Sequence, residues 1–133
     1  MAAVQVQHFL GRARDFLEGM NFLKDDLAFS SALLGIHCAI SYCDALRTGM
    51  GREKVSSDDH SKAASDLESL LKSRNFENRK GIGHLKKLLG MKSGIEYEPV
   101  TVRENEIEDI VRQAERFAEW ADATGRKLKI EGW

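Results

Sequence analysis

LAFSSALLGIHCAISYCDAL, residues 27–46, is the longest apolar stretch of the chain. It approaches the length that spans a bilayer, but it also contains polar side chains: Ser30, Ser31, His37, Ser41 and Asp44. Because a charge inside a membrane is costly, the stretch is predicted to be a core helix, running from about Phe22 to Thr48. A helix that is apolar on nearly every side belongs at the centre of a bundle.

Four other segments repeat apolar residues at three- and four-residue steps, the period of an amphipathic helix. Their apolar faces run from Val6 to Met20, from Ala63 to Leu71, from Leu85 to Leu89 and from Ile107 to Ala121. No segment of useful length alternates as a β-strand would. With 133 residues available for one core, the sequence predicts a single all-α domain over 1–133, an up-and-down bundle of four to five helices.

Polar and glycine-containing segments predict where the helices end. Ser56–Asp58 offer N-caps for the third helix, and the polar stretch Ser73–Gly83 is expected to be a loop. Thr101, with a glutamate three residues later, forms a capping box that starts the last helix. The tail, residues 126–133, is expected to be extended or disordered.

Composition limits the location and the partners. Twenty basic and twenty-one acidic residues give a net charge of -1, which would not draw the protein non-specifically to nucleic acid or membrane. Cys38 and Cys43 point about 140° apart on a helix, so they are expected to be buried free thiols in a reducing compartment. No basic region followed by an apolar run starts the chain, so we expect no signal peptide, no membrane contact and a cytoplasmic location.

Several motifs of known chemistry are missing from the sequence. It has no phosphate-binding glycine loop ending in Lys-Ser/Thr, no Cys-x-x-Cys, no Gly-x-Ser-x-Gly and no His-Glu-x-x-His. We therefore expect no metal site and no cofactor.

A line of polar residues follows one face of the central helix. His37, Ser41 and Asp44 lie at steps of four and three, and Arg47 comes next on that face. His60 is expected nearby, beyond the glycine turn. An unpaired buried carboxylate is costly, so Asp44 either joins a satisfied core network or lines a binding cleft. The sequence leaves both readings open.

The run ALLGIHCAISYCDAL (residues 32–46), a glycine turn and then Asp59-His60 resemble the HEPN family. The resemblance continues through 85–89, 92–97 and the last helix, and covers roughly residues 25–123. HEPN proteins are small helical bundles of bacteria and archaea, found in toxin–antitoxin systems and RNA-processing enzymes. The resemblance implies a two-fold homodimer, and a partner that is RNA, a nucleotide or a nucleotidyltransferase-like protein.

Active members of this family are metal-independent ribonucleases, with an arginine followed four to six residues later by a histidine. The resemblance places Lys92 at the arginine position and Tyr97 or Glu96 at the histidine position. Lysine lacks the bidentate fork of arginine, and tyrosine, with a reference pKa of about 10, is a poor base at neutral pH. Arg79 and His84 match the spacing literally, one helix earlier.

The most basic part of the chain surrounds this second match. It is the expected phosphate-binding surface, with Arg74, Arg79, Lys80, Lys86 and Lys87 as its candidate contacts. Three functions follow as alternatives: a metal-independent ribonuclease using His84, Arg79, Lys92 or Tyr97; a non-catalytic RNA- or nucleotide-binding module; and a helical interaction subunit. Because no histidine follows Lys92, we expect a non-catalytic module, with the ribonuclease as the alternative.

Overall fold

The computed structural model describes residues 2–53, 55, 60–96 and 104–133. This part of the chain forms five α-helices and a 3-10 turn, and none of it is β-strand. The elements are α1 (Ala2–Leu23), α2 (Ala28–Gly49), η2 (His60–Lys62), α3 (Ala63–Ser73), α4 (Lys80–Glu96) and α5 (Glu104–Lys127). The all-α bundle predicted from the sequence is confirmed.

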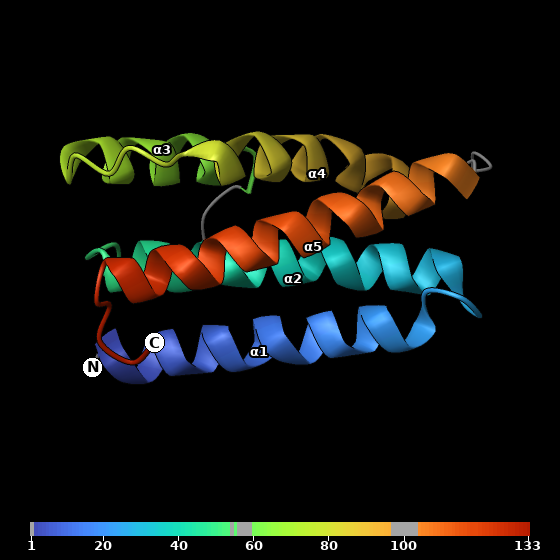
Figure 1. The fold of residues 1–133 in the computed structure, drawn as a ribbon, viewed down its shortest axis with the longest axis horizontal. Coiled ribbons are helices and arrows are strands. Elements are labelled where there is room, and N and C mark those ends of the chain that lie inside the picture. The colour runs from blue at the N-terminus through green and yellow to red at the C-terminus, as the bar shows by residue number, and fades with distance from the viewer. Residues whose placement is uncertain (1, 54, 56–59, 97–103) are drawn as a thin grey trace.

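The helices are arranged around α2 (Figure 1). α1 runs along one side of α2, α3 and α4 lie on the opposite side, and α5 crosses obliquely in front of it. Every residue from Cys38 to Thr48 is buried. α2 is long and apolar enough to cross a membrane by length and composition, yet 72% of its most apolar window is buried inside the bundle. That is the environment of a core helix.

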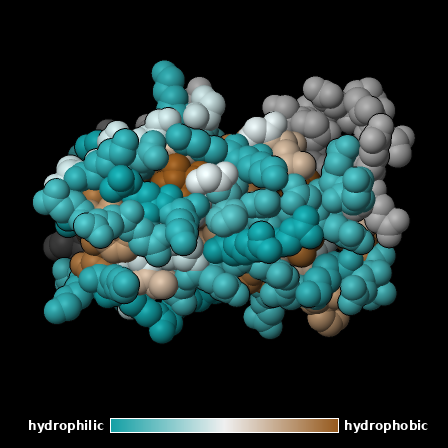
Figure 2. All heavy atoms as spheres, turned by 45° about the horizontal axis from the view of Figure 1, so that its top comes forward, coloured by the Kyte–Doolittle hydropathy of each residue, from teal (hydrophilic) through white to brown (hydrophobic). Residues whose placement is uncertain are grey.

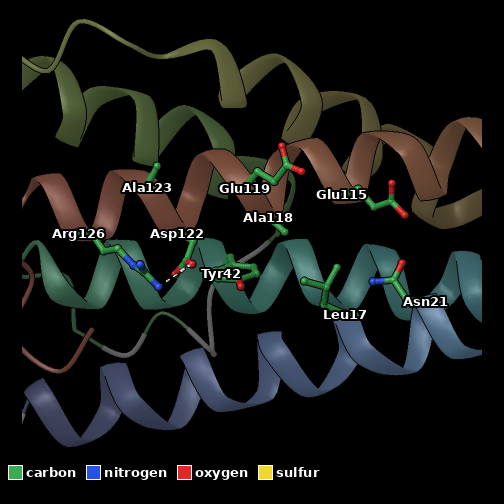
Figure 3. Close-up of a pocket in the computed structure, with 9 residues that line it drawn as sticks. All are labelled: Leu17, Asn21, Tyr42, Glu115, Ala118, Glu119, Asp122, Ala123 and Arg126. Carbon is green, nitrogen blue, oxygen red and sulfur yellow. Dashed lines mark hydrogen bonds and ion pairs between the residues drawn. The ribbon is translucent and has the colours of Figure 1, made fainter.

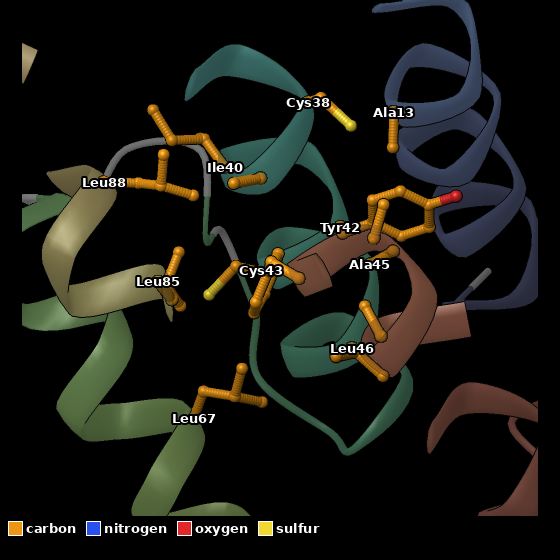
Figure 4. Close-up of a cluster of buried hydrophobic side chains, with 14 of the residues drawn as sticks. Ala13, Cys38, Ile40, Tyr42, Cys43, Ala45, Leu46, Leu67, Leu85 and Leu88 are labelled. Atoms are coloured by element: carbon orange, nitrogen blue, oxygen red, sulfur yellow. The ribbon is translucent and has the colours of Figure 1, made fainter. Parts of the chain in front are cut away.

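Small residues allow close contact at the centre of the bundle. A Cβ at Gly35 would lie 2.8 Å from the Met20 sulfur and 3.1 Å from the Ala114 Cβ, so α1 and α5 both approach α2 at this glycine. Figure 4 shows the neighbouring core, where Cys43, Leu67, Leu85 and other labelled side chains from α2, α3 and α4 face one another. Filling this core provides the main hydrophobic stabilisation of the fold.

The first helix boundary differs from the prediction. Phe22 belongs to α1, and a turn separates α1 from α2, closed by a 2.8 Å hydrogen bond from the Leu27 amide to the Leu23 carbonyl. The apolar pattern continues through this turn, so periodicity alone did not reveal the break. The predicted caps at Ser56–Asp58 and Thr101 lie outside the described residues.

α4 begins at Lys80, within the segment predicted to be a loop. The ring of Trp120 covers Gly81 so closely that an added Cβ would overlap it. The indole Nε1 also donates to the Asn78 carbonyl at 2.9 Å. Glycine at 81 therefore allows α4 to pack on α5, and here it does not mark a loop.

The C-terminal tail is ordered, which corrects the prediction of an extended or disordered segment. α5 continues to Lys127, and the chain then turns back onto the bundle. Ile130 is buried against Gly49, the last residue of α2. Trp133 donates from Nε1 to Asp122 Oδ1 at 2.9 Å. The contacts that hold the tail come from α2 and α5, and the tail sequence alone did not indicate them.

Candidate functional site

A groove of about 530 Å³ lies between α1 and α5, above α2 (Figure 3). Its lining combines apolar, acidic and basic side chains: Leu17, Asn21, Tyr42, Glu115, Ala118, Glu119, Asp122, Ala123 and Arg126. In Figure 3 the α5 carboxylates follow one edge and Tyr42 rises between the helices. This volume is in the usual range for small-molecule sites.

Asp122 organises one end of this groove. Its Oδ1 accepts hydrogen bonds from Arg14 Nη2 and Trp133 Nε1, both at 2.9 Å, and its Oδ2 accepts one from Arg126 Nη2 at 3.2 Å. Burial tends to raise the pKa of this carboxyl, but the hydrogen bonds from Trp133 and Arg14 and the two arginine charges outweigh it and lower the pKa. Asp122 is thus an ionised structural contact that joins α1, α5 and the tail.

Tyr42 and Glu115 are two further polar groups of the groove. Burial raises the pKa of Tyr42 to about 12, so the phenol keeps its proton at neutral pH. Glu115 is paired with Lys24 Nζ at 3.6 Å. Catalysis of proton transfer needs a group that titrates near the working pH. At neutral pH Asp122 is ionised and Tyr42 is protonated, so the groove offers hydrogen-bonding sites beside the side chains of Glu115 and Glu119.

The predicted polar line of α2 is divided between two neighbours. The His37 ring lies 5.9 Å from the Phe16 ring on α1. Asp44 and Arg47 are buried, with Arg47 Nη1 3.6 Å from Asp44 Oδ1. Arg47 Nε donates to Asp66 of α3 at 2.8 Å. Asp44 and Arg47 thus form a buried ion pair, and Arg47 links this pair to Asp66 of α3. His60 lies half-buried in η2.

The side chains of Arg79 and His84 bind different partners. Arg79 Nη1 donates to the Phe76 carbonyl at 2.8 Å. The His84 ring donates through Nδ1 to Gln113 Oε1 on α5. Lys92 is half-buried near the end of α4, and Tyr97 lies outside the described residues. The structure does not bring Arg79 and His84 into contact with each other.

Most of the predicted phosphate-binding surface contacts groups of the protein itself. Arg74 Nη2 donates to the Met50 carbonyl at 3.3 Å, Lys86 lies 3.4 Å from Glu68, and Lys87 lies 3.6 Å from Asp109. Lys80 is exposed. The two acids come from α3 and α5, so the sequence around the lysines gave no sign of them.

A cysteine nucleophile and a metal site are two other possible chemistries, and the described residues support neither. Cys38 and Cys43 are free and buried; burial raises the pKa of Cys38 to about 12 and that of Cys43 further still. A thiolate is the reactive form, so neither is an activated nucleophile. In the same residues, no group of three or more His, Cys, Asp or Glu side chains is placed to hold a metal ion.

A feature that the sequence analysis missed lies at the α1–α2 turn. Phe22 is 81% exposed, Leu27 55% and Phe29 49%. These three residues, called the apolar end from here on, contrast with the mostly hydrophilic face seen in Figure 2, where apolar patches are small. All three fell inside or beside the predicted core helix, so their apolar character was attributed to burial.

Comparisons of the chain with protein-family models, with curated proteins and with solved structures gave no match. The fold defines the class of protein as an all-α helical bundle. Its function has to be argued from its own side chains.

Proposed function

We propose that this chain is a non-catalytic protein-interaction module with a HEPN-like bundle. The observation that carries the proposal is the apolar end, where Phe22, Leu27 and Phe29 are each exposed within a short stretch of the chain around the α1–α2 turn. Aromatic residues are enriched in the cores of protein interfaces, and clustered exposed apolar side chains mark sites of association. The HEPN resemblance supports the same conclusion, since members of that family act with partner proteins.

The ribonuclease alternative has weaker support. Proton abstraction from a ribose hydroxyl needs an available base beside a cation that stabilises the phosphate. Here Arg79 is bonded to the Phe76 carbonyl and His84 to Gln113, so both would have to leave their partners to act together. Lys92 is followed by no histidine at the family spacing.

RNA or nucleotide binding by the basic stretch is the second candidate. Lys86 and Lys87 keep about half of their side-chain surface exposed (51% and 56%) despite their ion pairs. Exposed pairs of this kind contribute little, so a phosphate could compete for them. This candidate predicts binding that weakens steeply with salt.

The homodimer implied by the family resemblance is part of the proposal. Every residue of α2 from Cys38 to Thr48 is buried within the bundle, so this part of α2 offers no surface to a second copy. A second copy would have to use another surface. Light scattering at micromolar concentration tests this, and the mass of a monomer would count against the dimer.

Assays with RNA separate the three functions. Wild type, His84→Ala and Lys92→Ala are incubated with single-stranded RNA in excess chelator, and the binding of uncleaved RNA is measured by gel shift at two salt concentrations. We expect no cleavage and only weak binding. Cleavage lost in His84→Ala would refute a non-catalytic role. Tight, salt-dependent binding lost in a Lys86→Glu/Lys87→Glu variant would favour the RNA-binding module.

A further inference from the structure

A second groove, of about 410 Å³, lies along α1 beside Leu34 of α2 and includes Phe22 of the apolar end. Its lining, called the α1 groove here, is Asp15, Phe16, Glu18, Gly19, Phe22, Leu23 and Leu34. A Cβ at Gly19 would lie 3.1 Å from Leu34 Cδ1, so the absent side chain brings α1 close to α2 and leaves the groove open. The base of the groove is apolar, and its polar residues are both acidic.

The neighbourhood of the α1 groove is also acidic. Residues 12–27 contain four acids, Asp15, Glu18, Asp25 and Asp26, and three bases, Arg12, Arg14 and Lys24; Arg14 is paired with Asp122 of α5. Lys24 is paired with Glu115 of α5. The four acids are exposed, and within the described part of the chain none of their carboxylates takes part in an ion pair or side-chain hydrogen bond. Their charge is therefore available to a ligand.

We infer that the α1 groove and the apolar end dock a basic amphipathic helix of a partner protein. This inference rests on the interaction function proposed above and names the chemistry of the partner. Apolar residues of that helix, at i, i+3 or i+4 and i+7, pack against Phe22 and the base of the groove. Its Lys or Arg side chains pair with Asp15 and Glu18, which stand three residues apart on one side of α1.

Charge decides between this occupant and the others. In a two-fold dimer formed through the α1 groove, the groove of one subunit would face the same groove of the other. The acids of the two subunits would then lie close together, and like charges across an interface are unfavourable. RNA and anionic lipid are repelled for the same reason. A basic helix gains both the apolar contact and opposite charge.

A peptide selection tests the inference. A displayed library of helical peptides of about 18 residues, five turns, is selected on the full chain at low salt. We expect the enriched peptides to carry Lys or Arg on one face and apolar residues at helical spacing on the other. Their binding should weaken by at least about tenfold in Phe22→Ser and in Asp15→Lys/Glu18→Lys, which corresponds to about 1.4 kcal/mol.

Matched variants control for general effects of the substitutions. Val4→Ser removes another exposed apolar side chain, 63% exposed, from the same helix but outside the groove. Glu106→Lys/Glu108→Lys makes the same charge change at exposed positions of α5. Both should bind the selected peptides as wild type does. Circular dichroism checks that every variant is folded, which is expected because all these side chains are exposed.

Each other result overturns the inference. No enrichment, or enrichment of acidic or uncharged peptides, shows that the α1 groove does not take a basic helix. If the selected peptides bind Phe22→Ser with the affinity of wild type, they bind to another surface. The proposed interaction function would then be kept, but the α1 groove would not be its binding site. A dimer that Phe22→Ser dissociates in light scattering shows that a second copy is the occupant. If the protein cleaves RNA and this activity requires His84, the proposed non-catalytic function is itself refuted.

Discussion

Replacing Gly49 by alanine tests the packing of the C-terminal tail. Gly49 is the last residue of α2, and its φ is not positive, so alanine fits the backbone there. An added Cβ would overlap Ile130 Cγ2 and lie 3.1 Å from Ile130 Cδ1. In a helix without such a contact, Gly→Ala stabilises by about 0.5–1 kcal/mol. At Gly49 we expect the opposite sign.

The size of the effect follows from the cost of overpacking. Forcing one extra methyl into a filled site costs about 1–3 kcal/mol, and the gain in helix propensity offsets up to about 1 kcal/mol of this. With the full offset, Gly49→Ala should therefore lower the free energy of unfolding by up to about 2 kcal/mol. Ile130→Ala should itself cost about 2 kcal/mol, the low end for a buried isoleucine, because Ile130 lies at the edge of the core. In the Ile130→Ala background the clash is gone, and Gly49→Ala should be neutral or stabilising.

Urea unfolding followed by circular dichroism measures the four proteins of this cycle. A coupling energy of about 2 kcal/mol between the two sites is expected. Gly11→Ala is the matched control, since nothing lies within 4 Å of a Cβ at that position of α1, and it should stabilise. If Gly49→Ala stabilises the protein as Gly11→Ala does, the tail does not pack on α2 and the reasoning fails.

Two further predictions concern buried and half-buried titratable groups. The pKa of Asp122 is lowered in the folded protein, so its contribution to stability is present above the unfolded carboxyl pKa of about 3.9 and is lost as the pH falls through the folded value. Asp122→Asn should therefore be less stable than wild type at neutral pH, with a difference that shrinks in strong acid; an unchanged difference would refute this. Cys38 and Cys43, buried with raised pKa values, should react with iodoacetamide only as fast as the protein opens. Rapid labelling of the native protein, detected by mass spectrometry, would contradict their burial.

The helices were predictable because their apolar residues repeat with a strong period. The stripe from Ile107 to Ala121 gave α5, and the dense apolar run gave α2 its central place. The α1–α2 turn was not predictable in the same way. Phe22, Leu27 and Phe29 continue the apolar pattern, yet all three are exposed. A buried site calls for an apolar residue, but an apolar residue does not guarantee a buried site.

For the candidate site, contacts between neighbours on one helix were predictable and contacts between helices were not. Arg47 follows Asp44 by three residues, so their pairing could be expected from the sequence. The partners of His84 and Lys87, by contrast, are Gln113 and Asp109 on α5. The sequence identifies the most basic stretch of the chain, but it does not show that acids of α3 and α5 lie beside it in the fold.

Energy favours the apolar end over the basic stretch as the place where a partner binds. Phe22 is 81% exposed, and fully burying a Phe side chain contributes about 1.5–3 kcal/mol before the entropic costs of association. A phosphate that displaces Glu68 from Lys86 exchanges one exposed ion pair for another, and each such pair is worth about 0–1 kcal/mol. Binding at the basic stretch would need several such exchanges at once, whereas one aromatic anchor and two unengaged carboxylates already favour a basic helix in the α1 groove.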